Sequence, residues 1–388
     1  MKKVEVAIIG AGSAGMRAYR EASKVTDSIV LIEGDQYGTT CARVGCMPSK
    51  LLIAAAEAAH AGSQADAFGI HYGDRIIDGE AVMKRVREER DRFVGFVVED
   101  VEEWPEEHRI KGYAKFKSDH VLQINENLEI EAERVVIATG SRPLVPGPWQ
   151  AFGDRIVTTD DFFELEELPG TMAVIGLGTI GLELGQSLAR LGVEITGFDQ
   201  LETIGGLQDP EVRRHAIEIL GREFTLHLGQ PAVVEAAEDR LRVSAGEHSV
   251  LVDKVLCSIG RVPNVENLGL ETLGIALDDR GMPPFNPNTM QVADLPVFIA
   301  GDVTGDRMIL HEAGDEGRIA GYNACRDKVT AFRRKTPLAI NFCDPNICAV
   351  GARPGELDPD STATGEIGFA PVGRALIMGK HRGLLRVY

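Results

Sequence analysis

Two cysteines, Cys41 and Cys46, lie five positions apart and could exchange disulfide bonds with a substrate thiol. A regular α-helix would hold their Cα atoms roughly 8–9 Å apart, which is beyond the usual range for a disulfide. If the two thiols bridge, the segment must therefore depart from a regular helix, with Gly45 as the expected point of relief. A strained and accessible bridge of this kind exchanges readily with substrate thiols.

Other interpretations of the cysteine pair remain open. A zinc site would need more ligands, and although Cys343 and Cys348 repeat the spacing, no histidine accompanies them. The two thiols could instead be buried as small apolar side chains. A structural disulfide conflicts with the cytoplasmic location that a large chain without a recognisable export signal indicates. We therefore favour redox exchange, and we expect no metal ligands.

The composition is that of a globular protein and argues against two classes of partner. Of 388 residues, 59 are acidic and 41 are basic, which gives a formal net charge of −18. A nucleic acid or an anionic membrane surface would require clustered lysine and arginine, so we expect neither. No window approaches the ~18 uncharged apolar residues of a membrane span. Glu5 interrupts the apolar run near the N-terminus, which argues against a signal peptide and favours a cytoplasmic protein.

A glycine-rich turn follows the first apolar run of the chain. Residues 4–9 predict a buried parallel strand, and a helical stretch begins after the turn. A second strand over 28–32 ends in Glu33, 23 residues after Gly10. In a dinucleotide-binding fingerprint the glycines permit close approach of a pyrophosphate to a helix N-terminus, and the carboxylate binds ribose hydroxyls. The glycines of this turn are Gly10, Gly12 and Gly15.

The same pattern recurs in the middle of the chain. A strand over 172–175 leads into a second glycine-rich turn, and the following strand over 194–198 ends in Asp199, again 23 residues after the first glycine. Asp199 would repel a 2′-phosphate, and the next residues, 200–202, include no arginine, which favours NAD over NADP at this site. By the same logic Glu33 suits the unphosphorylated adenosine ribose of FAD. One such motif is weak evidence, but two copies with matched acids predict two dinucleotide sites. The second set of glycines is Gly176, Gly178 and Gly181.

The segment 41–50 resembles the active-site signature of the pyridine nucleotide-disulfide oxidoreductases, whose dihydrolipoamide dehydrogenases carry a similar Cys-x-x-x-x-Cys-x-Pro-Ser-Lys. Further segments resemble the family's later motifs in the family's order, and the resemblance covers essentially the whole chain. It implies an α/β fold with two Rossmann-like domains, as in glutathione reductase, and an incomplete α+β dimer-interface domain. The later segments are 138–143, 181–185, 258–264 and 298–302.

The resemblance also implies a domain order. We expect a first FAD-binding segment at 1–150, an NAD-binding domain at 151–275, a second FAD-contacting segment at 276–335 and a partial interface domain at 336–388. Proline-bearing stretches at 143–148 and 283–287 suit crossings between domains. The charged stretch 80–107 predicts a solvated pair of helices.

Individual roles follow from the resemblance, position by position. Cys41 matches the cysteine that exchanges with the dithiol, and Cys46 matches the cysteine that contacts the flavin. Lys50 matches the lysine near flavin N5, and Glu183 matches the acid that pairs with it. Asp302 matches the carboxylate that holds the ribityl chain. The full set for FAD is Gly10, Gly12, Gly15, Glu33, Thr40, Lys50, Ala114, Thr139, Gly140, Asp302 and Leu310, and for NAD it is Gly176, Gly178, Gly181, Asp199 and Gly260.

The sequence departs from the family pattern in three places. Gly38-Thr39-Thr40 stands where relatives commonly have Gly-Gly-Thr, and Ala114 stands where many have glycine. The family closes with a His-Pro…Glu motif whose histidine is the acid–base for the dithiol, and neither His311 nor His381 fits that motif. We expect a truncated copy, or further residues that complete it. The final segment, 383–388, predicts an apolar strand without a partner strand.

The implied reaction is oxidation of a dihydrolipoyl group by NAD⁺ through FAD and the two cysteines. Without the acid–base, dithiol turnover should slow strongly while NADH still reduces the flavin, so that diaphorase activity remains. The expected partners are a small disulfide or the lipoyl domain of a 2-oxo acid dehydrogenase complex, and a second copy of the chain. The alternatives are a mercuric-reductase-like or other disulfide reductase, or a flavin-binding remnant.

Overall fold

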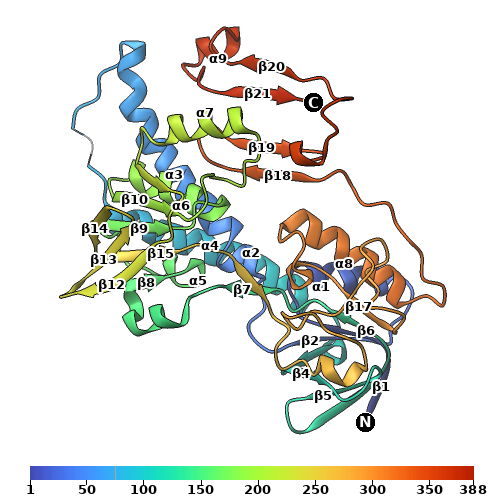
Figure 1. Ribbon diagram of the computed structural model, residues 1–388. Helices are drawn as coiled ribbons and strands as arrows, with labels where there is room; N and C mark the ends of the chain where they lie inside the picture. Colours follow the sequence, from blue (N-terminus) through green and yellow to red (C-terminus); the bar gives the residue numbers. More distant parts are fainter. Residues whose placement is uncertain (75) are drawn as a thin grey trace. The chain divides into compact units, whose positions relative to one another are not determined.

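The computed structural model describes residues 1–74 and 76–388, and the chain divides into two compact units (Figure 1). Each unit is assembled from three stretches of the chain. Unit 1 comprises Met1–Gly45, Arg90–Arg142 and Arg261–Lys335. Unit 2 comprises Cys46–Glu89, Pro143–Gly260 and Thr336–Tyr388.

Unit 1 is built on a sheet in the order β3-β2-β1-β6-β5-β4, with β17 added to β6. The β1 strand pairs in parallel with both β2 and β6, and its last residues are fully buried, as continuous apolar runs in a parallel sheet require. Because β17 pairs with β6, segments about 160 residues apart share one sheet. The strands are β1 Lys2–Ile9, β2 Ile29–Glu33, β3 Arg109–Lys111, β4 Ala114–Phe116, β5 Val121–Ile124, β6 Leu128–Ile137 and β17 Val297–Ile299.

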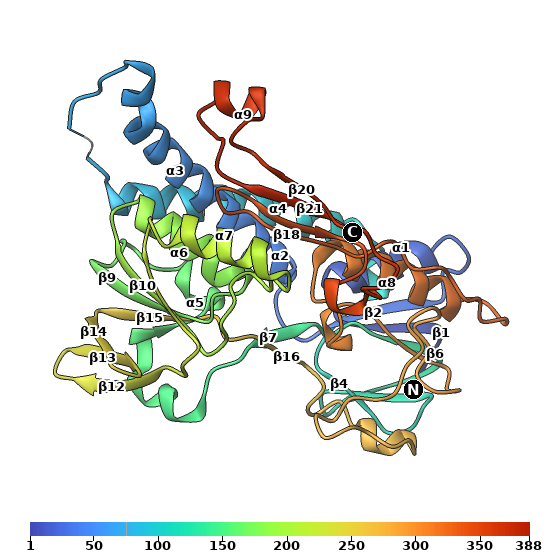
Figure 2. The same ribbon diagram turned by 45° about the horizontal axis from the view of Figure 1, so that its top comes forward.

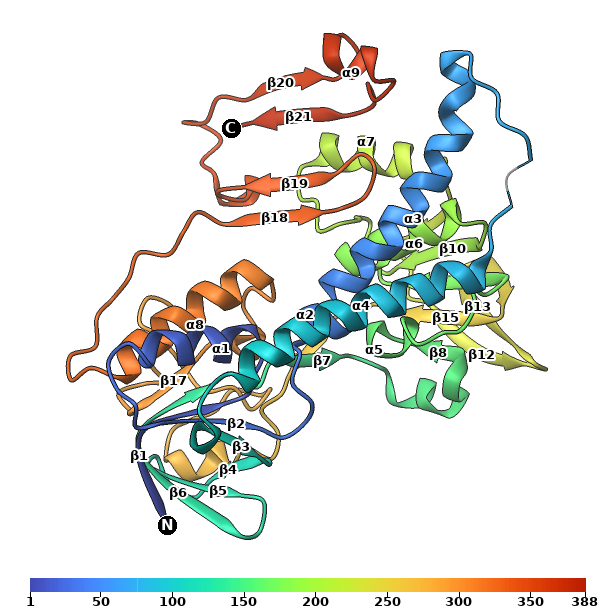
Figure 3. The ribbon, with the colours of Figure 1, turned by 180° about the vertical axis from the view of Figure 1, so that it is seen from behind.

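Helices α1 (Ser13–Ala22) and α8 (Leu310–Ala324) lie side by side in unit 1 (Figure 3). Their backbones touch. A Cβ on Gly317 would overlap the carbonyl oxygen of Ala14, and a Cβ on Gly321 would overlap that of Ala18. Glycine at these two positions of α8 therefore allows the close packing of the two helices.

The charged stretch after residue 79 forms one helix, so the predicted helix pair is wrong. Helix α4 (Gly79–Glu102) runs without interruption, and only a short 3₁₀ turn, Glu106–His108, follows it. No proline falls inside α4, and Met83, Val86 and Val101 along its length are completely buried. The apolar stripe thus continues through the stretch, and Pro105 comes only after the helix has ended.

Unit 2 is built on a second parallel sheet, in the order β11-β10-β9-β15-β8, and α6 (Thr179–Arg190) follows β9. An antiparallel sheet of β12, β13 and β14 lies against β9 and β15 (Figure 2). Helices α3 (Cys46–Gln64) and α6 pack against each other. The strands are β8 Ile156–Val157, β9 Thr171–Ile175, β10 Glu194–Asp199, β11 Thr225–Leu228, β12 Val233–Ala237, β13 Arg240–Ala245, β14 His248–Val252 and β15 Lys254–Cys257.

Two hairpins make up the C-terminal part of unit 2 (red in Figure 1). In the second, β21 (Leu384–Val387) pairs antiparallel with β20 (Gly365–Gly368), so the expectation that the final strand lacks a partner is wrong. The β20 sequence, Gly-Glu-Ile-Gly, carries almost no strand signal, because glycine and glutamate are depleted in strands. The other elements of this region are β18 Leu338–Asn341, β19 Ile347–Val350 and α9 Gly373–Ile377.

The remaining short elements connect these layers. They are α2 Thr40–Arg43, β7 Ser141–Pro143, α5 Thr159–Phe162, α7 Pro210–Leu220 and β16 Arg261–Pro263, and β7 pairs with β16. Among the described residues, no helix combines the length and the apolar character that crossing a bilayer requires. The domain limits expected from the sequence stay a prediction.

Candidate active site and nucleotide sites

Cys41 and Cys46 lie on two different helices. Helix α2 begins after Thr39, which has a φ of 58° and whose hydroxyl accepts a hydrogen bond from the Ala42 amide at 3.2 Å. It ends at Arg43, and α3 begins at Cys46. The segment is therefore not one regular helix, which is the departure that a bridge between the two thiols would require. Both thiols are partly exposed, so neither cysteine is a core residue.

Gly45 lies at the break between α2 and α3. A Cβ at this position would come within 3.0 Å of the Thr40 carbonyl oxygen and 3.3 Å of the Cys41 Cα. A larger residue would therefore push against the backbone that carries Cys41. Thr40 itself is exposed at the start of α2.

Lys50 and Glu183 form an ion pair that joins α3 to α6. The Lys50 ammonium lies 2.6 Å from Glu183 Oε2, and the Glu183 side chain is only 5% exposed, against 36% for Lys50. The second carboxylate oxygen of Glu183 accepts the Phe342 backbone amide at 2.9 Å. The Lys50 ammonium also lies 4.5 Å from the centre of the Phe342 ring, within reach of a cation–π contact. Sequence reasoning missed Phe342.

One face of α6 binds the turn after β18 through polar side chains. Gln186 bonds to the backbone of Asp344 at 2.8 and 2.9 Å, and the buried Arg190 joins Glu223 at 2.6 Å to Asp344 at 3.1 Å. The polar residues of this face recur at helical spacing, which is a signal present in the sequence itself. They are Thr179, which bonds to Asn341, then Glu183, Gln186 and Arg190.

The first glycine-rich turn has the geometry of a pyrophosphate site. Gly10 has a φ of 104°, and a Cβ on Gly15 would overlap the Gly10 carbonyl oxygen. Gly12 precedes α1, no side chain caps that helix end, and a Cβ on Gly12 would meet nothing within 4 Å. The start of α1 therefore offers uncapped amides beside open space, which fits the phosphates of FAD.

Glu33 closes the first turn from the end of β2. Its Oε2 accepts the Ala11 amide at 2.6 Å and its Oε1 accepts the Asp35 amide at 3.0 Å. The carboxylate is thereby fixed beside the glycine-rich turn, and its remaining lone pairs can accept hydrogen bonds from ribose hydroxyls.

The second glycine-rich turn repeats this geometry in unit 2. Gly176 has a φ of 92°, and a Cβ on Gly181 would overlap the Gly176 carbonyl oxygen. Gly178 precedes α6, again without a side-chain cap and with open space around its Cα. Asp199 accepts the Leu177 amide at 2.7 Å and the Leu201 amide at 2.9 Å. The residues present thus fit a second dinucleotide.

Asp302 follows β17 and is held by polar neighbours within unit 1. Its Oδ2 accepts the Ser141 hydroxyl at 2.9 Å, and Ser141 in turn accepts Arg261 Nε at 2.8 Å. The amide of Gly301, the preceding residue, donates to Glu316 at 2.8 Å. Sequence reasoning missed Ser141, Arg261 and Glu316.

The other predicted contact residues are distributed along the same units. Ala114 is buried on β4, and Leu310, half exposed, begins α8. The Thr139 hydroxyl donates to the Asn264 carbonyl at 2.7 Å. Gly140 and Gly260 have φ values of 68° and 127°, which favour glycine.

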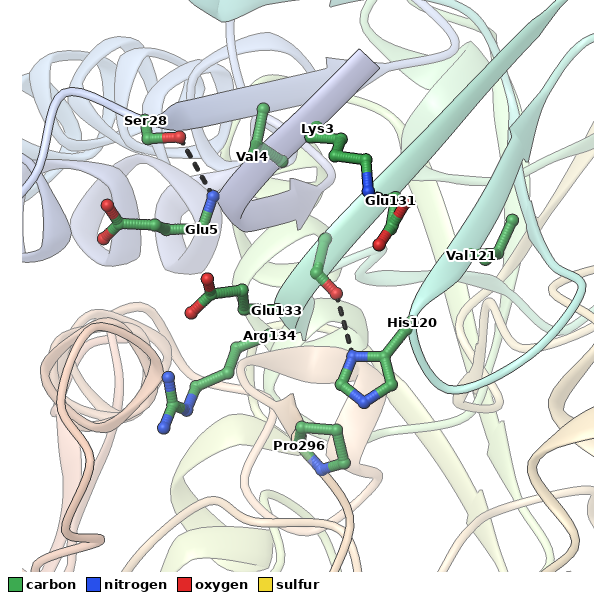
Figure 4. A pocket seen from close by; sticks show the side chains of 11 residues that line it. Lys3, Val4, Glu5, Ser28, His120, Val121, Glu131, Glu133, Arg134 and Pro296 are labelled. Atoms are coloured by element: carbon green, nitrogen blue, oxygen red, sulfur yellow. Dashed lines mark hydrogen bonds and ion pairs between the residues drawn. The ribbon is translucent and has the colours of Figure 1, made fainter. Parts of the chain in front are cut away.

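Unit 1 contains a cavity of about 800 Å³. Figure 4 shows the side chains that line it, among them Lys3, Glu5 and Pro296. Lys3 and Glu5, at the start of β1, line it, whereas Gly10 follows the end of that strand. Two of its charged groups are paired within the protein: Lys3 with Glu131 at 2.9 Å and Arg134 with Asp327 at 3.8 Å. It is therefore not the nucleotide site. Across residues 1–74 and 76–388, no three His, Cys, Asp or Glu side chains are grouped as metal ligands.

Comparison with known proteins places this geometry in a family. Residues 4–317 match the family model described as pyridine nucleotide-disulphide oxidoreductase, and the chain belongs to this family. Enzymes of the family use FAD and NAD(H), so the chain is an FAD-dependent oxidoreductase of this class. The expected enzyme class and cofactors are confirmed.

Several relatives are named dihydrolipoyl dehydrogenase. The chain is 32% identical to that of Haloferax volcanii over 406 residues, covering 99% of this chain and 83% of the relative. It is 32% identical to dihydrolipoyl dehydrogenase 3 of Pseudomonas aeruginosa over 414 residues, covering 100% of this chain and 85% of the relative. It is 30% identical to dihydrolipoyl dehydrogenase 2 of Haloarcula marismortui over 404 residues, covering 99% and 84%.

Solved structures share the fold. LpdA from Mycobacterium tuberculosis has a TM-score of 0.85 at 24% identity, and the match covers 100% of this chain and 86% of that one. The Cu(II) complex of the flavoprotein disulfide reductase RclA from Escherichia coli has a TM-score of 0.84 at 24% identity with the same coverage. The α/β fold class expected from the sequence is confirmed.

Proposed function

We propose that this chain is an enzyme of the dihydrolipoyl dehydrogenase type, which oxidises a dithiol through Cys41 and Cys46 and passes hydride to NAD⁺. The observation that carries the proposal is the break between α2 and α3, which separates two partly exposed cysteines. The names of the relatives support the choice of a lipoyl substrate.

In this proposal Cys41 and Cys46 form a disulfide in the oxidised enzyme. A substrate thiolate attacks the Cys41 sulfur, forms a mixed disulfide there and displaces Cys46 as a thiolate. The second substrate thiolate then attacks its partner sulfur in the mixed disulfide, releases the cyclic disulfide product and leaves Cys41 reduced. The cysteine pair thus gains two electrons, and the dithiol loses two electrons and two protons.

Cys46 is placed to carry the negative charge that this exchange creates. It is the first residue of α3, and a negative charge at a helix N-terminus is favoured by the helix dipole. Lys50 follows four residues later, on the same face of the helix. Glu183, held by the Phe342 amide, fixes the Lys50 ammonium in turn.

We assign the two nucleotides to the two glycine-rich turns. Bound FAD supplies the two-electron chemistry that links thiol oxidation to hydride transfer. The first turn would receive its pyrophosphate, Glu33 its adenosine ribose and Asp302 its ribityl chain. The second turn and Asp199 would hold NAD(H). Further contacts would come from Thr40, Lys50, Ala114, Thr139, Gly140 and Leu310 for FAD and from Gly260 for NAD.

The proposed partner is a lipoyl group, either free or on the lipoyl domain of a 2-oxo acid dehydrogenase complex, and the resemblance further predicts a homodimer. We also retain the predicted division into FAD segments at 1–150 and 276–335, an NAD domain at 151–275 and an interface segment at 336–388. A sheet that joins β6 to β17 supports the pairing of the two FAD segments.

Steady-state assays with NADH separate the steps. The FAD-loaded chain should reduce an artificial dye with NADH, but it should reduce lipoamide only slowly, because none of the histidines in the sequence matches the acid–base of the family. Cys41→Ser and Cys46→Ser should each abolish lipoamide reduction and leave dye reduction, because the dye needs only the flavin. Cys348→Ser, which changes an exposed thiol on β19, is the matched control and should alter neither activity. Lipoamide turnover that survives loss of Cys41 or Cys46 would contradict the proposal.

A further inference from the structure

The carboxylate of Glu316 is the most deeply buried charged group of α8, with 1% of the residue exposed. Its Oε2 accepts the Gly301 amide at 2.8 Å, and its Oε1 accepts Arg334 Nη2 at 2.9 Å. Burial raises the pKa of Glu316 above its ordinary value, although Arg334 and the Gly301 amide oppose the rise. A charge in such a place is stable only when it is paired and hydrogen-bonded, so both bonds are required.

Gly301 forms the turn that leads from β17 to Asp302. Its φ is 84°, and a Cβ at this position would come within 2.8 Å of the Ala14 Cβ on α1. The turn therefore lies directly against the helix that follows the first glycine-rich loop. There is no room for a side chain at position 301 that could fix the turn. The hydrogen bond from the Gly301 amide to Glu316 fixes it instead.

Asp302 is consequently restrained from two directions. Ser141 donates to its carboxylate at 2.9 Å, and the peptide that precedes it is held by Glu316. We propose that Glu316 is a positioning residue for FAD, which fixes the Gly301–Asp302 turn so that the Asp302 carboxylate is preorganised for the flavin's ribityl chain. The inference rests on the role proposed above for Asp302.

Arg334 holds Glu316 in place from the segment after α8. Its guanidinium also contacts Glu312 Oε2 at 2.6 Å and the Pro287 carbonyl at 3.1 Å, and its side chain is 14% exposed. A planar fork of donors can span two carboxylates and a carbonyl at once, which a lysine ammonium cannot reproduce. Arg334 thus offsets the repulsion between the buried carboxylates of Glu312 and Glu316 and holds both of them in position.

Asp315 offers a matched control, because it is buried beside Glu316 on the same helix. It is 7% exposed, and its carboxylate pairs with Lys335 at 2.9 Å and Arg318 at 3.0 Å, whereas the Gly301 amide bonds to Glu316. A loss of charge at 315 therefore perturbs the same helix without releasing Asp302.

The test titrates FAD into the apoprotein and follows quenching of flavin fluorescence, with the melting temperature of the apoprotein as a second measurement. Glu316→Ala should weaken FAD binding about tenfold. Glu316→Gln, whose amide oxygen still accepts the Gly301 amide, should recover most of the affinity, and Asp315→Asn should match the unaltered chain. If Glu316→Ala does not fold, Arg334→Lys replaces it and should weaken binding to a smaller extent.

Three outcomes overturn the inference. The first is FAD binding by Glu316→Ala as tight as that of the unaltered chain. The second is equal weakening by Asp315→Asn, which would mean that Glu316 acts through general helix stability. The third is unchanged FAD binding by Asp302→Ala, which would overturn the proposed role of Asp302 and the inference with it. If Asp302→Ala weakens FAD binding but Glu316→Ala does not, only the inference about Glu316 is refuted.

Discussion

Glu33 and Asp199 make the same pair of backbone hydrogen bonds in two separate sheets. Each accepts an amide from the residue 22 positions earlier, at 2.6 and 2.7 Å, and another from the residue two positions later, at 3.0 and 2.9 Å. The chain therefore contains two glycine-rich turns closed by a carboxylate in the same way. A substitution in one turn can therefore be compared with the same substitution in the other turn as its control.

Asp199→Ala should impair the use of NADH. Loss of the carboxylate that we propose binds the NAD ribose should raise the KM for NADH roughly 10- to 100-fold, since hydrogen bonds to charged groups are the stronger ones. It should also narrow the preference for NADH over NADPH, because the group that repels a 2′-phosphate is gone. Dye-reduction kinetics with both nucleotides measure this. The FAD content should be unchanged, and Glu33→Ala should show the reverse pattern.

Gly12→Ala and Gly178→Ala probe whether phosphate lies against the two turns. Both glycines have negative φ, and an added Cβ meets nothing within 4 Å, so the folded chain should tolerate either change. Gly12→Ala should weaken FAD binding about tenfold or more with an unchanged apoprotein melting temperature. Gly178→Ala should leave FAD bound and raise the KM for NADH. Gly15→Ala, by contrast, should fail to fold stably, because its Cβ would overlap the Gly10 carbonyl.

The Lys50–Glu183 pair should show coupling in a double-mutant cycle. Lys50→Met leaves a buried carboxylate without its counterion and should lower the free energy of unfolding by about 1–3 kcal/mol, reduced from the fully buried case because Lys50 is 36% exposed. Adding Glu183→Gln to that variant should restore most of the loss. Denaturant unfolding of the four proteins measures the coupling, and strictly additive effects would exclude it.

Asp209 should make the C-terminal hairpin sensitive to acid. It caps α7, and its carboxylate accepts bonds from Val212, Tyr388 and Arg386. Burial raises the pKa of Asp209, but these bonds outweigh it and lower the pKa below its ordinary value. A lowered pKa stabilises the fold above the unfolded value of about 4, and this stabilisation is lost as the pH falls through the folded value.

Protection of the β21 amides from hydrogen exchange, after correction for the intrinsic exchange rate, should therefore fall as the pH drops below about 4. Asp209→Asn keeps an N-cap but carries no charge. Its β21 amides should exchange faster at neutral pH and show no further step in that range. The same acid step in both proteins would assign it to other groups.

The glycine-rich turns could be read from the sequence because their determinants are local. Gly10, Gly15 and Glu33 lie within one strand–helix–strand unit, so spacing alone places them together. Helix geometry predicted a break between Cys41 and Cys46 on the condition that the two thiols bridge. The family resemblance paired Lys50 with Glu183, which are 133 positions apart, and no periodicity would have joined them.

The missed residues depend on long-range packing. Phe342 reaches Glu183 across 159 positions, and Glu316 holds a turn 15 residues earlier through a backbone amide, which leaves no trace in residue type. The partner of β21 was missed because β20 is rich in glycine. The single helix α4 was divided in two because its charge density masked a continuous buried stripe.

The backbone contact between α1 and α8 joins two segments that leave the ribosome at very different times. The glycine-rich loop of unit 1 emerges from the ribosome first, but β17 and α8, which complete its sheet and cover α1, are made only after residue 297. The strands of the parallel sheet of unit 2 lie between these two segments in the sequence, within the continuous stretch from β8 to β15. The nascent chain can thus form the parallel sheet of unit 2 while the sheet of unit 1 still lacks β17.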